Sequence, residues 1–149
     1  MAVYYLDTSA LVKRYAQERG TAWMLSLTHV AAEHDLYTVR VTGPEMIAAL
    51  FRKARTGEVS PDEARRSAEN FRADWQQQYQ IVEVTTLVAD GAMELAQEYG
   101  LRGYDAVHLA CSLLWQEILD YPVTLVTYDS QLWQAANSAG LRALPESLT

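Results

Sequence analysis

The chain has 149 residues, of which 50% are apolar or aromatic and 21% are charged, a balance that excludes a disordered chain and predicts one folded domain. A single cysteine, Cys111, excludes both an intrachain disulfide and a cysteine-rich zinc site. The formal net charge of −7 by itself argues against a nucleic-acid partner, because phosphates repel an acidic surface.

Strand-like and helical segments alternate along the chain almost without a break. Residues 2–6 are short, apolar and rich in β-formers, which predicts a buried strand, and Asp7 follows as the cap of a helix. In chain order, the later patterns predict a helix at 21–33, a strand at 36–41, helices at 42–56 and 61–75, a strand at 81–84, helices at 88–99 and 104–118, a strand at 123–127, a helix at 130–139 and an edge strand at 141–144.

Strands separated by helices require crossover connections. The order therefore predicts an α/β fold, in which a largely parallel sheet is flanked by helices, within one domain over residues 1–149. In such sheets, ligands bind beyond the carboxyl ends of the strands. Polar residues that follow strands are therefore the first candidates for a functional site.

Four carboxylates lie at the starts of helices. Asp7 and Asp129 end two apolar strands, Glu45 is in the first turn of its helix, and Asp105 is near the start of the most apolar helix. Each one alone is explained by helix capping, because acidic residues favour helix amino ends. Together they predict a cluster of acids at one edge of the sheet.

Such a cluster indicates metal chemistry. Several crowded carboxylates do not stay ionised without a cation, and oxygen ligands without a histidine or cysteine cluster favour Mg²⁺ or Mn²⁺. These ions serve phosphoryl and phosphodiester chemistry by activating water and offsetting charge on the leaving oxygen. The hydroxyls of Thr8, Ser9 and Thr127 are near enough in sequence to hold the carboxylates or a water.

The ordered set of motifs resembles a PIN domain, and more narrowly the compact VapC-like toxins of toxin–antitoxin pairs. The resemblance covers nearly the whole chain and rests on four motifs whose acids are separated by 38, 60 and 24 residues. Those motifs are Asp7-Thr8-Ser9-Ala10-Leu11 after a strand, Glu45 at a helix start, Tyr104-Asp105-Ala106-Val107-His108-Leu109-Ala110, and Val126-Thr127-Tyr128-Asp129.

The resemblance implies a three-layer fold with a mostly parallel sheet of about five strands. It also implies a ribonuclease in which Asp7, Glu45, Asp105 and Asp129 bind Mg²⁺ or Mn²⁺ and hydrolyse RNA. Members of this family often form homodimers and are held inactive by a partner antitoxin. His108, one turn after Asp105, is expected to be a packed or hydrogen-bonded histidine.

Three cations could guide RNA toward an acidic site. Lys13 and Arg14 lie within two turns of Asp7, and Arg52 is seven residues after Glu45, on the same helical face. They could hold phosphates beside the acids, or they could simply form solvated helix faces.

Two other functions stay open on the residues. One is a magnesium-dependent phosphatase of another α/β fold, although such folds usually place a second aspartate two residues after the first, where this chain has Ser9. The other is a regulatory module whose acids bind metal without turnover.

The location expected from the sequence is the cytoplasm. The first residues lack the charged region and apolar core of a signal peptide, and no apolar run approaches the length of a membrane span. No membrane partner is therefore expected.

Overall fold

The computed structural model describes residues 1–148 and contains one five-stranded sheet, in the order β3-β2-β1-β4-β5. Every neighbouring pair of strands is parallel. The strands are β1 (Val3–Leu6), β2 (Asp35–Val39), β3 (Tyr79–Val82), β4 (Val123–Val126) and β5 (Arg142–Leu144). The predicted α/β class with a parallel sheet of about five strands is confirmed.

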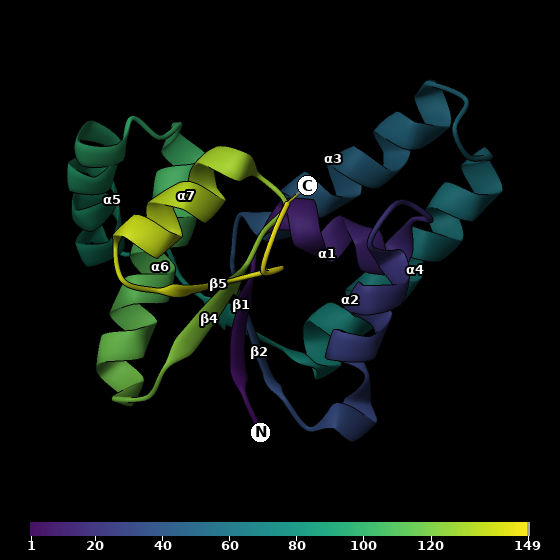
Figure 1. Cartoon of the computed structure of the whole chain (residues 1–149). Helices are drawn as coiled ribbons and strands as arrows, with labels where there is room; N and C mark the ends of the chain where they lie inside the picture. The colour runs from purple at the N-terminus through teal and green to yellow at the C-terminus, as the bar shows by residue number, and fades with distance from the viewer. Residues whose placement is uncertain (149) are drawn as a thin grey trace.

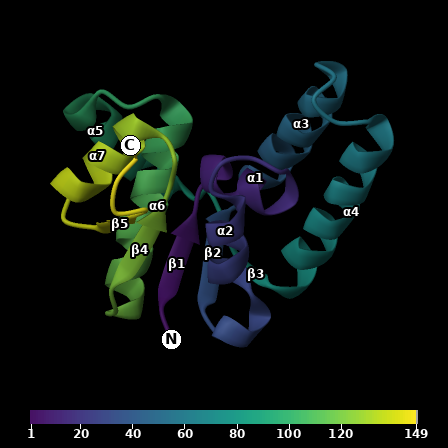
Figure 2. The same ribbon diagram turned by 45° about the vertical axis from the view of Figure 1, so that its right-hand side comes forward.

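Helices cover both faces of the sheet (Figure 1, Figure 2). They are α1 (Thr8–Tyr15), α2 (Thr21–Thr28), α3 (Thr42–Arg55), α4 (Pro61–Gln77), α5 (Thr86–Tyr99), α6 (Gly103–Leu119) and α7 (Ser130–Ser138), with the 3₁₀ turn η1 (Val30–Ala32). Helices α1 to α4 pack on one face and α5 to α7 on the other, and α3 and α4 extend together as an arm away from the sheet. Within residues 1–148, no helix is long and apolar enough to cross a bilayer.

Alternation along β1 divides the apolar side chains between the two faces. Val3 and Tyr5 pack with α5 to α7, whereas Tyr4 and Leu6 pack with α1 to α4. This is the two-residue period of a strand that is buried on both sides. Each strand therefore contributes to two cores, which fixes the sheet between the two helical layers.

The helix predicted over residues 21–33 is interrupted. Helix α2 ends at Thr28, whose hydroxyl donates to the Met24 carbonyl, and His29 has extended backbone angles. The His29 ring accepts a hydrogen bond from the Ala31 N–H, which starts the short turn η1. Local side-chain hydrogen bonds have thus replaced continuous helix.

Two strand boundaries also differ from the prediction. Strand β2 ends at Val39 rather than residue 41, because the backbone turns there into α3. Strand β3 covers Tyr79–Val82 rather than 81–84, since Tyr79 is the residue paired with Leu36 of β2. The exposed Val84 lies beyond the sheet.

The register of β1 against β4 positions the candidate site. Tyr5 is opposite Leu125 and Leu6 is opposite Val126, so both strands end at the same level. The next residues, Asp7 and Thr127, therefore leave the sheet side by side at its carboxyl edge.

Leu125 tests how strongly the sheet is held by burial. Leu125→Ala removes a side chain that is 0% exposed on an inner strand, and we expect the free energy of unfolding to fall by about 2–5 kcal/mol. The matched change Leu87→Ala, at a side chain 65% exposed on α5, should cost no more than ~0.5 kcal/mol. Urea denaturation of the three proteins measures both, and equal losses would contradict the assigned burial.

Candidate functional site

Asp7 is buried at the end of β1, where it also caps helix α1. Its Oδ1 accepts the Ala10 N–H at 2.9 Å and the Ser9 hydroxyl at 2.8 Å. Its Oδ2 accepts the Thr127 hydroxyl at 2.5 Å. Because Thr127 follows β4, this hydrogen bond joins the ends of the two neighbouring strands.

The hydroxyls of Ser9 and Thr127 also connect Asp7 to the segment that carries Asp129. The Thr127 oxygen accepts the Asp129 N–H at 3.0 Å, and the Ser9 oxygen accepts the Tyr128 N–H at 2.9 Å. Ser9 and Thr127 thus hold the turn that carries Asp129 against the turn that carries Asp7. The predicted supporting role of both residues agrees with these contacts.

Burial raises the pKa of Asp7 from 3.8 to about 6. The hydrogen bonds from Thr127, Ala10 and Ser9 oppose this rise by favouring the ionised form, and the charge of Asp129 adds to it. The side chain is only 3% exposed. Asp7 is therefore a carboxylate whose charge is costly in the absence of a cation.

Asp105 and Asp129 share one arginine. Arg102 donates from Nη2 to Asp129 Oδ2 at 3.0 Å, and its Nε lies 3.3 Å from Asp105 Oδ2. Burial raises the pKa of Asp105, the charge of Asp129 raises it further, and Arg102 opposes both. Asp129 Oδ1 accepts the Leu132 N–H as the cap of α7.

Glu45, in the first turn of α3, faces the site through two contacts. The Thr8 hydroxyl donates to Glu45 Oε1 at 3.0 Å, and His108 Nε2 lies 3.9 Å from the same oxygen. The other ring nitrogen of His108 is 2.9 Å from the Tyr5 hydroxyl inside the core. His108 is buried and contacts the Tyr5 hydroxyl, so it is the packed, hydrogen-bonded histidine predicted from the sequence. Burial also lowers its pKa.

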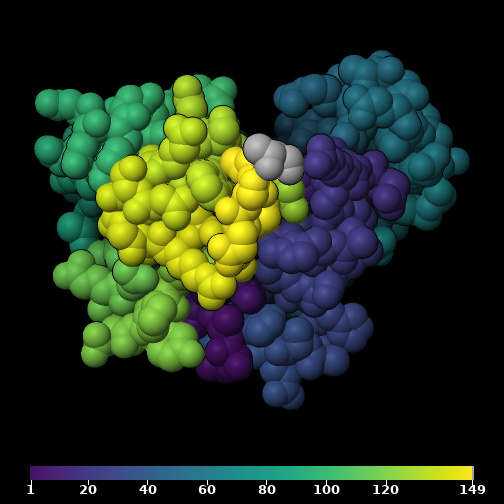
Figure 3. Space-filling view, in the orientation of Figure 1, coloured from purple at the N-terminus to yellow at the C-terminus, as the bar shows by residue number. Residues whose placement is uncertain are grey.

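A cavity of about 680 Å³ opens on two of the four acids, Glu45 and Asp105, whereas Asp7 and Asp129 are not among its lining residues. Glu45, Arg102, Tyr104 and Asp105 line it, together with Gly103 and Val107. In the space-filling view the surface is hollowed between α7 and the α3–α4 arm (Figure 3). The carboxyl edge of the sheet therefore offers room for a ligand beside the acids.

The donor set suits a hard divalent cation. Asp7, Glu45, Asp105 and Asp129 supply only carboxylate oxygens, the ligands that Mg²⁺ and Mn²⁺ prefer. Within residues 1–148, no three His, Cys, Asp or Glu side chains are already grouped closely enough to hold an ion. Arg102 bridges two of the acids, Asp105 and Asp129. Because the four acids are not grouped around one point, the predicted four-acid ligand set stays a prediction.

The three predicted RNA-binding cations have different surroundings. Lys13 pairs with Glu18 at 3.1 Å and lies over the Tyr128 ring. Arg14 is held by Gln78 and Tyr79 in a part-buried network. Arg52 is exposed on α3. Of the three, only Arg52 is exposed, so the predicted contact with phosphates stays a prediction. Lys13 and Arg14 have structural contacts that sequence spacing did not reveal.

Arg102 is the site residue that sequence reasoning missed. A signal for it exists, because Arg102 is three residues before Asp105 and an ion pair at that spacing is common around a helix start. Its second contact, to Asp129, joins residues 27 positions apart and is visible only in the fold.

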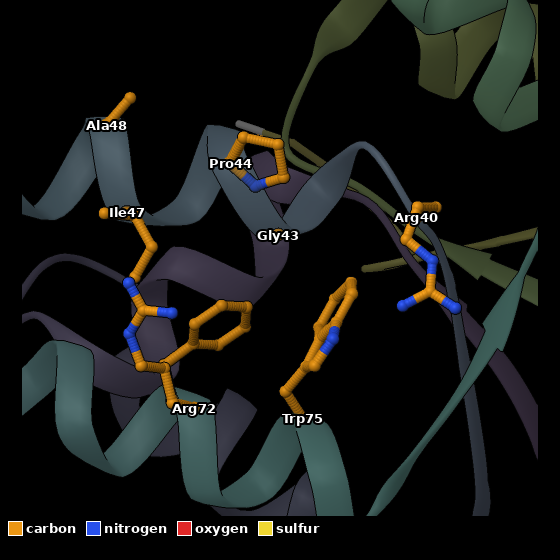
Figure 4. Close-up of a pocket in the computed structure, with 8 residues that line it drawn as sticks. Arg40, Gly43, Pro44, Ile47, Ala48, Arg72 and Trp75 are labelled. Carbon is orange, nitrogen blue, oxygen red and sulfur yellow. The ribbon is translucent and has the colours of Figure 1, made fainter.

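A second cavity, of about 590 Å³, lies between α3 and α4 (Figure 4). Trp75 stands in its wall and packs against Gly43, where an added Cβ would lie 3.3 Å from the indole. Arg40 and Arg72 flank the opening. A side chain at position 43, two residues before Glu45, would therefore crowd the Trp75 indole.

Comparisons with known proteins agree with the predicted resemblance. A family model described as PIN domain matches residues 4–137. Over 148 residues the chain is 33% identical to Ribonuclease VapC45 and to Ribonuclease VapC49, from two strains of Mycobacterium tuberculosis, and each match covers 99% of both chains. The fold is similar to a chain in a toxin–antitoxin complex from Klebsiella pneumoniae, with a TM-score of 0.66 at 17% identity, covering 98% of this chain and 99% of that one.

Asp7 gives the metal-free protein a measurable pH dependence. The pKa of Asp7 is raised from 3.8 to about 6 in the folded state, so the folded protein holds this proton more tightly than the unfolded chain does. The free energy of unfolding therefore includes a contribution that is fully present below pH 4 and is lost as the pH rises through 6. At ~1.4 kcal/mol per pH unit the loss is at most about 3 kcal/mol at neutral pH. We expect Asp7→Asn to avoid this loss, so the variant should exceed wild type in unfolding free energy at pH 7 but not at pH 4.

Urea denaturation at both pH values, in the presence of EDTA, measures this difference. Asp90→Asn, which removes an exposed carboxylate on α5, is the control and should track wild type at both pH values. An Asp7→Asn variant with the pH profile of wild type would show that burial of this charge has no cost.

Proposed function

The chain belongs to the PIN-domain family and to its VapC ribonucleases, and from this premise we propose that Asp7, Glu45, Asp105 and Asp129 form a metal-dependent site that hydrolyses RNA. The enzyme is a hydrolase, and nucleases of this family generally depend on a divalent metal. We propose that the domain is the whole chain and that the protein acts in the cytoplasm. Mg²⁺ or Mn²⁺ is the proposed ion.

One observation carries the site assignment. The hydrogen bonds from Thr127 to Asp7 and from Asp129 to Thr127, followed by the ion pairs of Arg102, connect three aspartates from three separate segments. Such a chain of contacts is unnecessary for helix capping, which Asp7 and Asp129 already complete through Ala10 and Leu132. The arrangement supports a shared role for the acids.

The protein residues have separate tasks in the proposed reaction. Asp7, Asp105 and Asp129 would hold the ion, which when bound supplies a hydroxide-like water and offsets charge on the leaving oxygen. Ser9 and Thr127 orient the Asp7 carboxylate. Glu45, fixed by Thr8, is a ligand or orients the attacking water from its place beside the cavity.

We also propose a protein partner. The structurally similar Klebsiella pneumoniae chain comes from a toxin–antitoxin complex, and the corresponding role for this chain is that of the toxin. A cognate antitoxin would block the site by inserting an arginine among the acids, since a guanidinium pairs well with carboxylates. The pairing of Arg102 with Asp105 and Asp129 supports this mode of inhibition. The family resemblance further suggests a homodimer.

Cleavage of RNA tests the function. We expect wild type to cut a mixed single-stranded RNA pool with Mn²⁺ or Mg²⁺ and to lose this activity in EDTA. Asp7→Asn and Asp105→Asn should each lower the rate at least about a hundredfold, because each removes a proposed ligand with little change in side-chain volume. The assay is gel electrophoresis of the RNA, with circular dichroism to verify folding.

The same preparations separate the alternative functions. Release of phosphate from small phosphate esters would favour a phosphatase, and metal binding without either activity would favour a regulatory module. Equal, EDTA-resistant cleavage by wild type and Asp7→Asn would identify a contaminating ribonuclease and remove the support for this proposal.

Arg52 tests how RNA reaches an acidic protein. Arg52→Glu reverses an exposed charge on the helix that carries Glu45, and we expect RNA binding to weaken roughly three- to tenfold at low salt and less at high salt. Fluorescence anisotropy, in an Asp105→Asn background that leaves the RNA intact, measures the affinity. Arg66→Glu, an exposed charge reversal on α4, is the control. An equal effect of the two changes would mean that only net charge matters.

A further inference from the structure

Arg102 closes the acidic site from its solvent side. Its side chain is 75% exposed, whereas the side chains of its partners Asp105 and Asp129 are only 14% and 23% exposed. The guanidinium thus contacts two carboxylates that are turned inward while most of the arginine stays in water. The residue also lines the cavity that contains Glu45 and Asp105.

Both oxygens of Asp129 already have a donor. Asp129 Oδ1 accepts the Leu132 N–H at 2.9 Å as the cap of α7. Oδ2 receives the Arg102 Nη2 at 3.0 Å. A second cation on Asp129 would therefore share an oxygen with one of these donors, and the charge of the Arg102 guanidinium would repel it.

Asp105 is the second carboxylate that Arg102 compensates. Its Oδ2 lies 3.3 Å from Arg102 Nε, and the negative charge of Asp129 is near enough to act on it. Without a positive charge between them, these two carboxylates would repel each other. Arg102 supplies that charge from the chain itself.

We propose that Arg102 is a displaceable counter-cation of the metal site: it pairs with Asp105 and Asp129 in the metal-free protein and releases both when a divalent ion binds. This inference rests on the proposed function, because it assumes that these aspartates are ligands. Arg102 is thereby a positioning residue: it holds the two aspartates in place in the metal-free protein, and its charge lowers their affinity for the metal ion.

The competition has a defined direction. Binding of the ion and pairing of Arg102 both place positive charge on the same two carboxylates, so each weakens the other by the same factor. Partly exposed ion pairs are weak, which limits the factor to roughly two- to tenfold. Salt screens the arginine contacts, so the factor should shrink as ionic strength rises.

Calorimetric titration of metal-free protein with Mn²⁺ tests the proposal without RNA and without activity. We expect Arg102→Ala to bind Mn²⁺ roughly two- to tenfold more tightly than wild type at low salt, with a smaller difference at high salt. Arg66→Ala is the matched control, because it removes one exposed positive charge on α4. Its affinity should stay within about twofold of wild type.

Nuclear magnetic resonance of the arginine Nε–H groups provides a second readout on wild type, so the test does not depend on a variant that folds. Arg102→Lys, which keeps the charge and removes the Nε–H, identifies the Arg102 signal. Titration with diamagnetic Mg²⁺ should change the chemical shift of this signal, with the same midpoint as metal binding. NaCl at equal ionic strength should not reproduce the change.

The outcomes separate the two proposals. If wild type binds Mn²⁺ but Arg102→Ala binds it equally or more weakly, or if the Arg102 signal stays fixed during the Mg²⁺ titration, the counter-cation role is wrong and the metal site stands. If wild type binds no Mn²⁺, or if Asp105→Asn binds it as tightly as wild type, the proposed metal site itself is wrong, and the role of Arg102 is rejected with it.

Discussion

The hydrogen bond from Thr127 to the buried Asp7 carboxylate joins the carboxyl ends of β1 and β4, and the candidate site depends on it. Parallel pairing brings these two residues to the same level of the sheet. Burial makes the charge of Asp7 costly, and three short hydrogen bonds offset part of that cost. The surrounding turns are consequently fixed in position before any ligand binds.

The two helical layers have different tasks around this edge. On one face, α1 and α3 bring Thr8 and Glu45 together, and Trp75 lies so near Gly43 that a side chain there would crowd the indole. On the other face, α6 and α7 carry Asp105 and Asp129, which Arg102 connects. The acids come from both layers, and Glu45 from one layer and Asp105 from the other line the same cavity at the sheet edge.

An acidic protein that acts on RNA must control its own negative charge. On the proposals above, the arginine bridge, a divalent ion and the arginine of an inhibitor would be three ways to place positive charge among the same carboxylates. Metal binding, inhibition and the metal-free state would then be competing forms of charge compensation. Because Arg102 is mostly exposed, its release from the two aspartates would require no change in the core.

The sequence by itself determined the fold class, because strand–helix alternation is a local pattern that appears directly in the residue order, and its four motifs were enough to indicate the family. It also singled out the four helix-start acids, whose joint role stays a prediction. It also predicted Ser9 and Thr127 beside Asp7, from spacing alone. It misplaced the end of the second helix, since His29 makes a local hydrogen bond that periodicity does not reveal. Only the tertiary structure decided that Arg102 bridges Asp105 and Asp129 and that Arg14 turns into a network with Tyr79, because these contacts join residues far apart in the chain.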